Sequence, residues 1–208
     1  PEDSPRPYKG WKATKCEEKS AWYRRLASEG QRPRAMVISC CDSRVHVTSI
    51  FGADQGEFFI HRNIANLVPK YEPDGNQHGT SAALEYAVTA LKVAHVIVLG
   101  HSQCGGVQGC LDMCSGRAPD LEESTSFVGR WLSILSPGVE EVKDLPEDEQ
   151  ARALEKETVV VSLRNLMTFP FVQRAVEAKD LSLHGLWTDI GEGGLESIDP
   201  KTGQFVKI

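Results

Sequence analysis

The chain has 208 residues, 40% of them hydrophobic, which is enough to bury one sizeable core and favours a single domain. Its 23 Lys and Arg residues against 29 Asp and Glu residues give a formal net charge of -6. That sign argues against nucleic acid and anionic membrane surfaces as partners. The most apolar stretch, residues 93–100, is far shorter than the roughly 20 residues of a membrane helix. The N-terminus lacks the apolar segment of a secretory signal, so we expect a cytoplasmic protein.

The cysteines favour metal binding or buried thiols over disulfides. A chain with an adequate core has little need of covalent cross-links. The six cysteines are Cys16, Cys40, Cys41, Cys104, Cys110 and Cys114. None of them has the C-x-x-C spacing of thiol redox proteins, so the sequence argues against that class of function.

The first part of the chain predicts one helix and three strands. Residues 11–29 mix aromatic and charged side chains and end at Gly30, which is typical of a helix with a glycine stop. Residues 34–39 and 57–61 are short apolar runs typical of strands. Residues 94–100 are rich in β-branched side chains, as expected of a buried parallel strand.

A helix is expected between the second and third strands. Residues 80–93 place Leu84, Val88 and Leu91 on one helical face. A strand, a helix and a strand in this order predict a right-handed parallel βαβ unit.

Helical and strand patterns alternate in the second half of the chain. Residues 127–135 carry an apolar helical stripe that we expect to stop at the following Pro-Gly pair. Residues 147–169 predict a helix, although their central run of valines also suits a strand. Residues 181–190 and 203–208 predict two strands joined by a turn as an antiparallel hairpin.

These elements predict an α/β fold. We expect a mainly parallel central sheet flanked by helices, with an antiparallel edge hairpin at the C-terminus and an N-terminal helical arm. Residues 1–208 are expected to form one domain, in which residues 1–30 are the arm and residues 31–208 the α/β core.

Two clusters of reactive side chains follow predicted strands. SCCDSRV at residues 39–45 comes directly after the first strand, and GHSQCGG at residues 100–106 after the third. Because ligands gather at the carboxyl ends of parallel strands, two clusters so distant in sequence can meet there. His101 and Cys104 are three residues apart, so a turn or the start of a helix aims both at one point.

Strand periodicity selects the cysteine of the first cluster. Cys40, Asp42 and Arg44 leave an extended chain on one side, so Cys41 is expected to face away and pack as a buried thiol. Thiolate and imidazole ligands suit zinc. Three protein ligands leave the fourth tetrahedral position for water, which is typical of a catalytic site.

Four motifs resemble, in order and spacing, those of the β-class carbonic anhydrases. They are CCDSRV, FFIHRNIANLVP, EYAV and GHSQCGG, and the resemblance is strong over about residues 31–110. It implies the reversible, zinc-dependent hydration of carbon dioxide to bicarbonate and a proton. One Zn²⁺ per chain is then held by Cys40, His101 and Cys104.

The resemblance also implies that Asp42 and Arg44 are catalytic. Beside the metal, an ionised Asp42 accepts a hydrogen bond from the bound water and turns its lone pair toward carbon dioxide. Arg44 pairs with Asp42, which keeps the carboxylate ionised and turned away from the metal.

Further residues match the family's substrate site. Gln31 resembles a glutamine of the plant-like branch of the family, which lies just before the first strand and reaches the substrate oxygens. Gly105 offers a backbone N–H to bicarbonate. Phe59, Ile64 and Tyr86 correspond to an apolar wall for carbon dioxide contributed by the partner subunit. The implied assembly is therefore a homodimer or a larger homo-oligomer.

Two alternatives remain open from the sequence. Proteins related to this family hydrolyse carbon disulfide or carbonyl sulfide with the same zinc site. The other alternative is a non-catalytic zinc protein that is structural or senses bicarbonate, against which the intact Asp42-Arg44 pair argues.

Overall fold

The computed structural model describes residues 5–75, 78–123 and 125–208 and divides the chain into two compact units. The smaller unit is Pro1–Arg32, and the larger is Pro33–Ile208. None of the helices within the described residues is both long and apolar enough to span a membrane.

Short helical pieces make up the smaller unit. They are α1 (Pro5–Trp11), the π-helix η1 (Lys12–Cys16) and α2 (Ser20–Glu29). Gly30 ends α2 with a φ of 72°, a left-handed conformation that glycine adopts readily, as the sequence predicted. The single helix expected over residues 11–29 is thus interrupted after Cys16.

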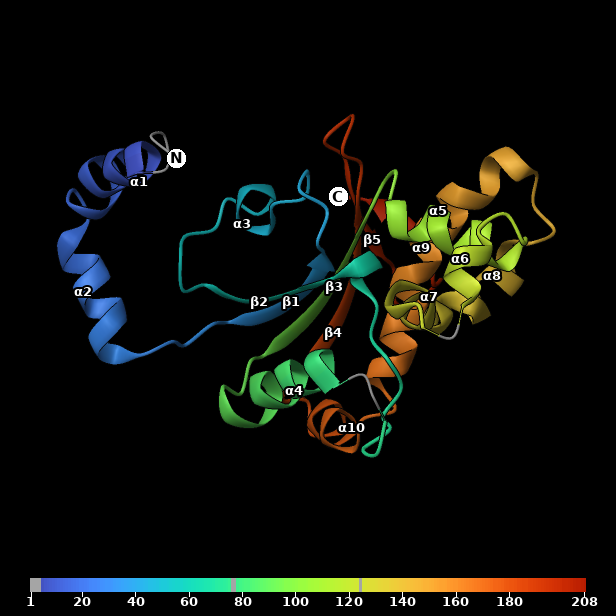
Figure 1. Cartoon of the computed structure of the whole chain (residues 1–208). Coiled ribbons are helices and arrows are strands. Elements are labelled where there is room, and N and C mark those ends of the chain that lie inside the picture. Colours follow the sequence, from blue (N-terminus) through green and yellow to red (C-terminus); the bar gives the residue numbers. More distant parts are fainter. Residues whose placement is uncertain (1–4, 76–77, 124) are drawn as a thin grey trace. The chain divides into compact units, whose positions relative to one another are not determined.

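A six-stranded sheet forms the centre of the larger unit, in the order β2-β1-β3-β4-β5-β6 (Figure 1). The strands β1 to β4 are parallel, whereas β5 and β6 are antiparallel to their neighbours. The strands are β1 (Ala35–Cys40), β2 (Phe58–Asn63), β3 (His95–His101), β4 (Ser182–Thr188), β5 (Leu195–Ile198) and β6 (Phe205–Lys207).

Helices connect these strands and cover the sheet. They are α3 (Val47–Ile50), η2 (Ile64–Asn66), α4 (His78–Glu85), η3 (Tyr86–Ala90), α5 (Gly105–Cys114), α6 (Pro119–Glu122), α7 (Phe127–Leu132), η4 (Ser133–Leu135), α8 (Ser136–Val142), α9 (Glu147–Leu166) and α10 (Pro170–Glu177). One core cluster packs Met36 and Ile38 of β1 with side chains of α4, α9 and α10. Val37, between them, joins a cluster with Val47 of α3. The alternation of β1 thus divides its side chains between the two faces of the sheet.

The C-terminal strands differ from the sequence prediction. Residues 181–190 do not form a hairpin with residues 203–208, because β4 lies parallel to β3 inside the sheet. The antiparallel edge hairpin is β5 with β6. The strand β5 was missed because Leu195–Ile198 is only four residues long and contains a glutamate and a serine.

Two helical predictions have different outcomes. The stop expected at Pro137-Gly138 is wrong, because Pro137 occupies the first turn of α8. Proline is favoured there, since the first turn of a helix does not need its N–H. The valine run of residues 159–161 lies inside the twenty-residue helix α9, so the helical interpretation is confirmed.

The helix α9 lies close against β3 and β4. A Cβ added at Gly100 of β3 would lie 2.8 Å from Val159 Cγ2 and 3.2 Å from the Glu155 carbonyl oxygen. Val159 is β-branched and backbone cannot move aside easily, so only glycine permits this approach.

We therefore expect Gly100→Ala to lower the free energy of unfolding by about 1–3 kcal/mol, the usual cost of overpacking. Urea denaturation of the zinc-loaded protein measures this change. Gly79→Ala is the control, because a Cβ at Gly79 in α4 meets no atom within 4 Å. Equal stability of Gly100→Ala and the wild type would contradict the close packing of α9.

Candidate metal centre and active site

The site lies where the order of the strands reverses. After β1 the chain forms β2, which pairs with one edge of β1. The next strand, β3, pairs with the opposite edge of β1. The parallel register sets Ser39 beside Leu99, so Cys40 and His101 leave adjacent strands at the same end. This is the position where ligand sites form in open α/β sheets.

Cys40, His101 and Cys104 form a buried cluster there. Their exposed fractions are 5%, 1% and 4%, and their ligand atoms lie within 4.8 Å of one another. The two Sγ atoms are 4.0 Å apart. Two sulfurs at about 2.3 Å from a tetrahedral zinc would lie about 3.8 Å apart, which is close to this separation. The sequence prediction that these three side chains meet is confirmed.

The orientation of His101 also fits a metal. Its Nδ1 lies 2.9 Å from the Ser102 carbonyl oxygen, to which only a protonated ring nitrogen can donate. Its Nε2 is buried and has no hydrogen-bond partner among the described residues. A buried nitrogen without a partner is costly, whereas a lone pair aimed at a metal is satisfied.

The two thiols form a hydrogen bond that shifts their pKa values in opposite directions. Their hydrogen bond lowers the pKa of Cys40 to about 4 and raises that of Cys104. The lowered pKa favours the thiolate form of Cys40, and a thiolate attracts a cation. Together with the imidazole, the pair forms a donor set suited to zinc.

Cys41 is oriented differently from the prediction. It is exposed rather than buried, and it lines a hollow together with Asn63 and Ile64. Because β1 ends at Cys40, the alternation that was expected to turn Cys41 into the core stops there. Its N–H instead donates to the Asn63 carbonyl oxygen at 2.8 Å.

Asp42 and Arg44 form a bidentate ion pair in the loop after β1. Arg44 Nε donates to Asp42 Oδ1 at 2.9 Å and Nη2 to Oδ2 at 2.6 Å, while the Arg44 backbone N–H adds a bond of 3.0 Å to Oδ1. These hydrogen bonds hold the pKa of Asp42 well below its usual range. Arg44 Nη2 also donates to the Gln103 carbonyl oxygen at 3.0 Å, which joins the pair to the loop between His101 and Cys104.

The other predicted site residues lie in different places. Gly105 begins α5 directly after Cys104. Ile64 lies beside Gly106, because a Cβ added at Gly106 would be 2.8 Å from Ile64 Cγ2. Phe59 and Tyr86 contact each other with ring centroids 5.9 Å apart. Phe59 is in register with Met36, four residues before Cys40 on β1. The ring pair is therefore away from the Cys40, His101 and Cys104 cluster of the same chain.

Arg62 supports the loop that carries Asp42, a contact that the sequence did not predict. Its guanidinium donates to the carbonyl oxygens of Cys40, Asp42 and Val45 at 2.8, 2.7 and 2.9 Å. Three donors in a fixed planar arrangement restrict the path of this loop. The arginine follows the strand pattern FFIH, but nothing in its spacing indicated these acceptors.

A buried polar stripe on α9 supports the other loops of the site. Ser162 Oγ donates to the Asn66 carbonyl oxygen at 3.0 Å, and Asn66 Nδ2 donates to Thr158 Oγ1 at 3.0 Å. Asn165 Nδ2 donates to the Val68 carbonyl oxygen at 2.8 Å. The stripe continues to Glu155, whose Oε1 accepts from the Gln103 N–H at 2.5 Å. These side chains recur at intervals of three and four residues, a polar helical period that the sequence contains and that we did not recognise.

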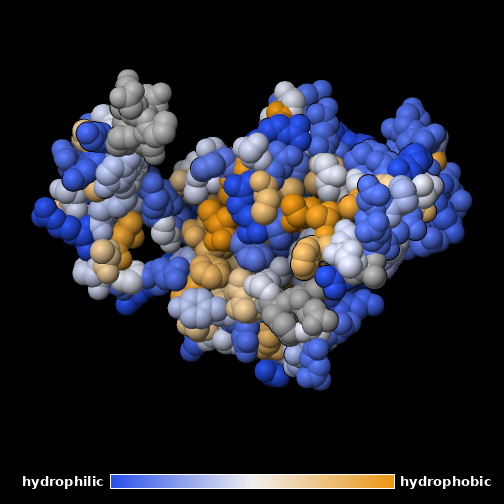
Figure 2. Space-filling view, in the orientation of Figure 1, coloured by the Kyte–Doolittle hydropathy of each residue, from blue (hydrophilic) through white to orange (hydrophobic). Residues whose placement is uncertain are grey.

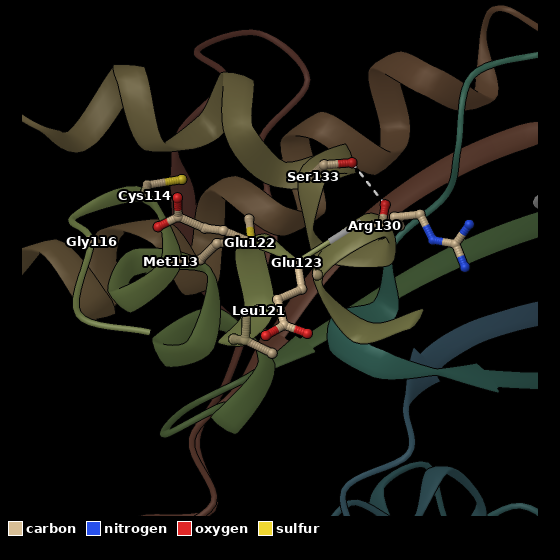
Figure 3. A pocket seen from close by; sticks show the side chains of 9 residues that line it. Met113, Cys114, Gly116, Leu121, Glu122, Glu123, Arg130 and Ser133 are labelled. Atoms are coloured by element: carbon tan, nitrogen blue, oxygen red, sulfur yellow. Dashed lines mark hydrogen bonds between the residues drawn. The ribbon is translucent and has the colours of Figure 1, made fainter. Parts of the chain in front are cut away.

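The hollow in Figure 3 lies elsewhere on the larger unit. It is lined by side chains of α5, α6 and α7 and of the segments around them, among them Cys114, Glu122 and Glu123. Cys110, one turn before Cys114, is buried and its Sγ lies 3.6 Å from the Leu132 carbonyl oxygen. Cys110 is thus a buried thiol of the core, whereas Cys114 is exposed.

Comparisons with known proteins agree with this geometry. A model of the carbonic anhydrase family matches residues 35–195. Beta carbonic anhydrase 3 of Arabidopsis thaliana is 38% identical over 199 residues, which cover 92% of this chain and 75% of that protein.

Solved structures give the same result. The β-carbonic anhydrase CcaA has a TM-score of 0.87 at 30% identity, over 97% of this chain and 89% of that chain. A tetrameric β-carbonic anhydrase of the ascomycete Sordaria macrospora has a TM-score of 0.74 at 29% identity, over 96% and 95%. The chain therefore belongs to the β class of the carbonic anhydrase family, and it is a zinc enzyme that hydrates carbon dioxide to bicarbonate.

Proposed function

We propose that Asp42 and Arg44 are the catalytic pair of this reaction. The observation that carries the proposal is their bidentate contact in the loop that begins at the metal ligand Cys40. Zinc bound to the cluster supplies an acidified water, whose pKa in the three-histidine carbonic anhydrases falls to about 7. The pair would then decide how the attacking oxygen is oriented.

The hydrogen bonds of Asp42 indicate which oxygen acts on the reacting water. Oδ1 accepts from both the backbone N–H and Nε of Arg44, so its two lone pairs are used. Oδ2 accepts from Nη2 alone among the described residues and keeps one lone pair. As an ionised group, Asp42 can only accept, so the water turns its hydrogen toward Oδ2 and its own lone pair toward carbon dioxide.

The same proposal assigns substrate contacts. The N–H of Gly105 lies in the first turn of α5, where N–H groups lack helical acceptors, and would donate to a bicarbonate oxygen. Gln31, of the N-terminal unit, would donate its amide to substrate. Phe59, Ile64 and Tyr86 would form an apolar wall, with the ring pair supplied by a partner subunit.

We further propose that the chain acts as a homodimer. Several apolar side chains of the larger unit are exposed, as the orange surface in the middle of Figure 2 illustrates. They include Ile60, Ile64, Tyr86, Phe127 and Val128, with exposed fractions of 39%, 39%, 49%, 84% and 44%. A second copy would cover these side chains and bring its own Phe59 and Tyr86 to the site. Larger homo-oligomers are compatible with this contact.

Residues 1–30 would serve as a helical arm of one domain whose core is residues 31–208. We also propose a cytoplasmic location.

We expect Asp42→Asn to lower carbon dioxide hydration by tens-fold or more, within the about 10²–10⁴ range of a positioned acid-base group. The amide presents an N–H to the water where the carboxylate accepts, so it misorients the attacking oxygen. Stopped-flow hydration assays measure the loss, and metal analysis should still find about one zinc per chain. Near-normal hydration with full zinc would refute the catalytic role of the pair.

Separate substitution of the two adjacent cysteines shows which of them is the zinc ligand. Cys40→Ser is expected to strip the zinc, because it removes a buried thiolate of the cluster, whereas Cys41→Ser should largely retain it. Metal content of the purified variants is the measurement. Equal loss of zinc in both would mean that Cys41 is also a ligand.

Phe127→Ser should weaken the homodimer, because the most exposed of these apolar side chains then leaves the contact. Sedimentation velocity at low micromolar concentration compares it with the wild type. Leu145→Ser is the control, since Leu145 is also exposed, at 39%, but does not line the hollow that Phe127 shares with Ile64. A wild-type chain that sediments as a fully active monomer would exclude the dimer.

A further inference from the structure

The peptide groups of Gln103 connect two parts of the site. The Gln103 carbonyl oxygen accepts from Arg44 Nη2 at 3.0 Å. Its N–H donates to Glu155 Oε1 at 2.5 Å, across 52 residues of sequence. Gln103 therefore lies between the catalytic pair on one side and a carboxylate of α9 on the other.

Gln103 also adopts an unfavourable backbone conformation. Its φ of 54° lies in the left-handed region, which residues with a Cβ enter at a cost. Such a conformation persists only when surrounding contacts hold it. The hydrogen bond to Glu155 is the contact that fixes the N–H side of this residue, between the ligands His101 and Cys104.

Glu155 is placed to do this, because its carboxyl is buried beside the loop between His101 and Cys104. It is 5% exposed, and its Oε2 is buried without a hydrogen-bond partner among the described residues. A buried carboxylate is costly unless it accepts strong hydrogen bonds. The hydrogen bond to the Gln103 N–H offsets part of the cost of burying the Glu155 carboxyl. The same residue, Gln103, accepts from Arg44 through its carbonyl oxygen, so this bond also bears on the position of Arg44.

We infer that Glu155 is a positioning residue: it holds the left-handed Gln103 peptide, whose carbonyl oxygen in turn fixes Arg44 and so aims Asp42 at the reacting water. This inference rests on the proposed catalytic role of Asp42 and Arg44. Glu155 itself touches neither substrate nor the reacting atoms.

The test uses the zinc-loaded enzyme and three variants of α9. Glu155→Ala should lower kcat/KM for carbon dioxide hydration about tenfold or more, as expected when a hydrogen bond to a charged group is lost. Glu155→Gln keeps an acceptor oxygen and should lose less. Glu157→Ala is the matched control, because Glu157 is a largely buried glutamate of the same helix that pairs with Arg164 instead of Gln103. It should keep wild-type kcat/KM.

A readout independent of activity follows the hydrogen bond directly. In the wild type, the short bond to a carboxylate should move the proton signal of the Gln103 backbone amide downfield in nitrogen-resolved NMR. Glu155→Ala should return that signal toward ordinary values and shift the Arg44 Nε signal with it. Zinc content should remain about one per chain.

A second substitution tests the strain. Gln103→Gly in the Glu155→Ala background should recover part of the lost activity, because glycine adopts a positive φ without the cost that other residues meet. The inference is overturned if Glu155→Ala keeps wild-type kcat/KM, if its Gln103 and Arg44 signals do not move, or if activity falls only in proportion to lost zinc.

Failure of the positioning role of Glu155 can be distinguished from failure of the catalytic role of Asp42 and Arg44. If Asp42→Asn stays active while Glu155→Ala still moves the Gln103 and Arg44 signals, the positioning contact stands and the catalytic proposal fails. If Asp42→Asn is inactive and those signals do not respond to Glu155→Ala, the reverse holds.

Discussion

The parallel pairing of β1 with β3 is the constraint on which the site depends. It brings Cys40 and His101 to the same end of neighbouring strands, although they are 61 residues apart in the sequence. A shift of one residue in this register would turn alternate side chains to the opposite face and separate the two ligands. The apolar side chains that fix the register, such as Val37 and Ile38, therefore also determine the distance between sulfur and imidazole. Zinc binding and the core of the fold are consequences of the same pairing.

Much of this arrangement was predictable from the sequence because it follows local patterns. The apolar runs of β1 and β3 and the helical period of α9 identify these elements, and the rule that sites form at strand ends brings the two motifs together. Cys104 could be placed because it follows His101 by three residues at the start of α5. Periodicity and strand order thus bring the three side chains to one place, whereas their assignment as the zinc ligands rested chiefly on the resemblance to the β-class carbonic anhydrases.

The errors arise where a local pattern ends or where tertiary contacts decide. Cys41 lies one residue beyond β1, so a period of two no longer describes it. Pro137 stops one helix in the sequence analysis but begins another in the structure, because proline suits both positions. Residues 181–190 pair with β3 rather than with the C-terminal strand, a choice made by long-range packing against α9. The roles of Arg62 and Glu155 depend on acceptors and donors that are remote in sequence, so no local pattern could reveal them.

The helix α9 has to satisfy two requirements that oppose each other. Val159 packs against the sheet, which favours an apolar face, yet Thr158, Ser162 and Asn165 on the same helix remain polar and buried. Each of these three donates or accepts a hydrogen bond in a segment that leaves β2, where Ala65 and Asn66 have positive φ values of 58° and 48°. Replacing them with apolar residues would add core contacts but release a backbone that cannot hold this conformation alone. A buried polar stripe thus costs stability and fixes two strained loops, those after β2 and β3, from one rigid element. The loops of the site are therefore positioned by α9, a helix that contributes no metal ligand.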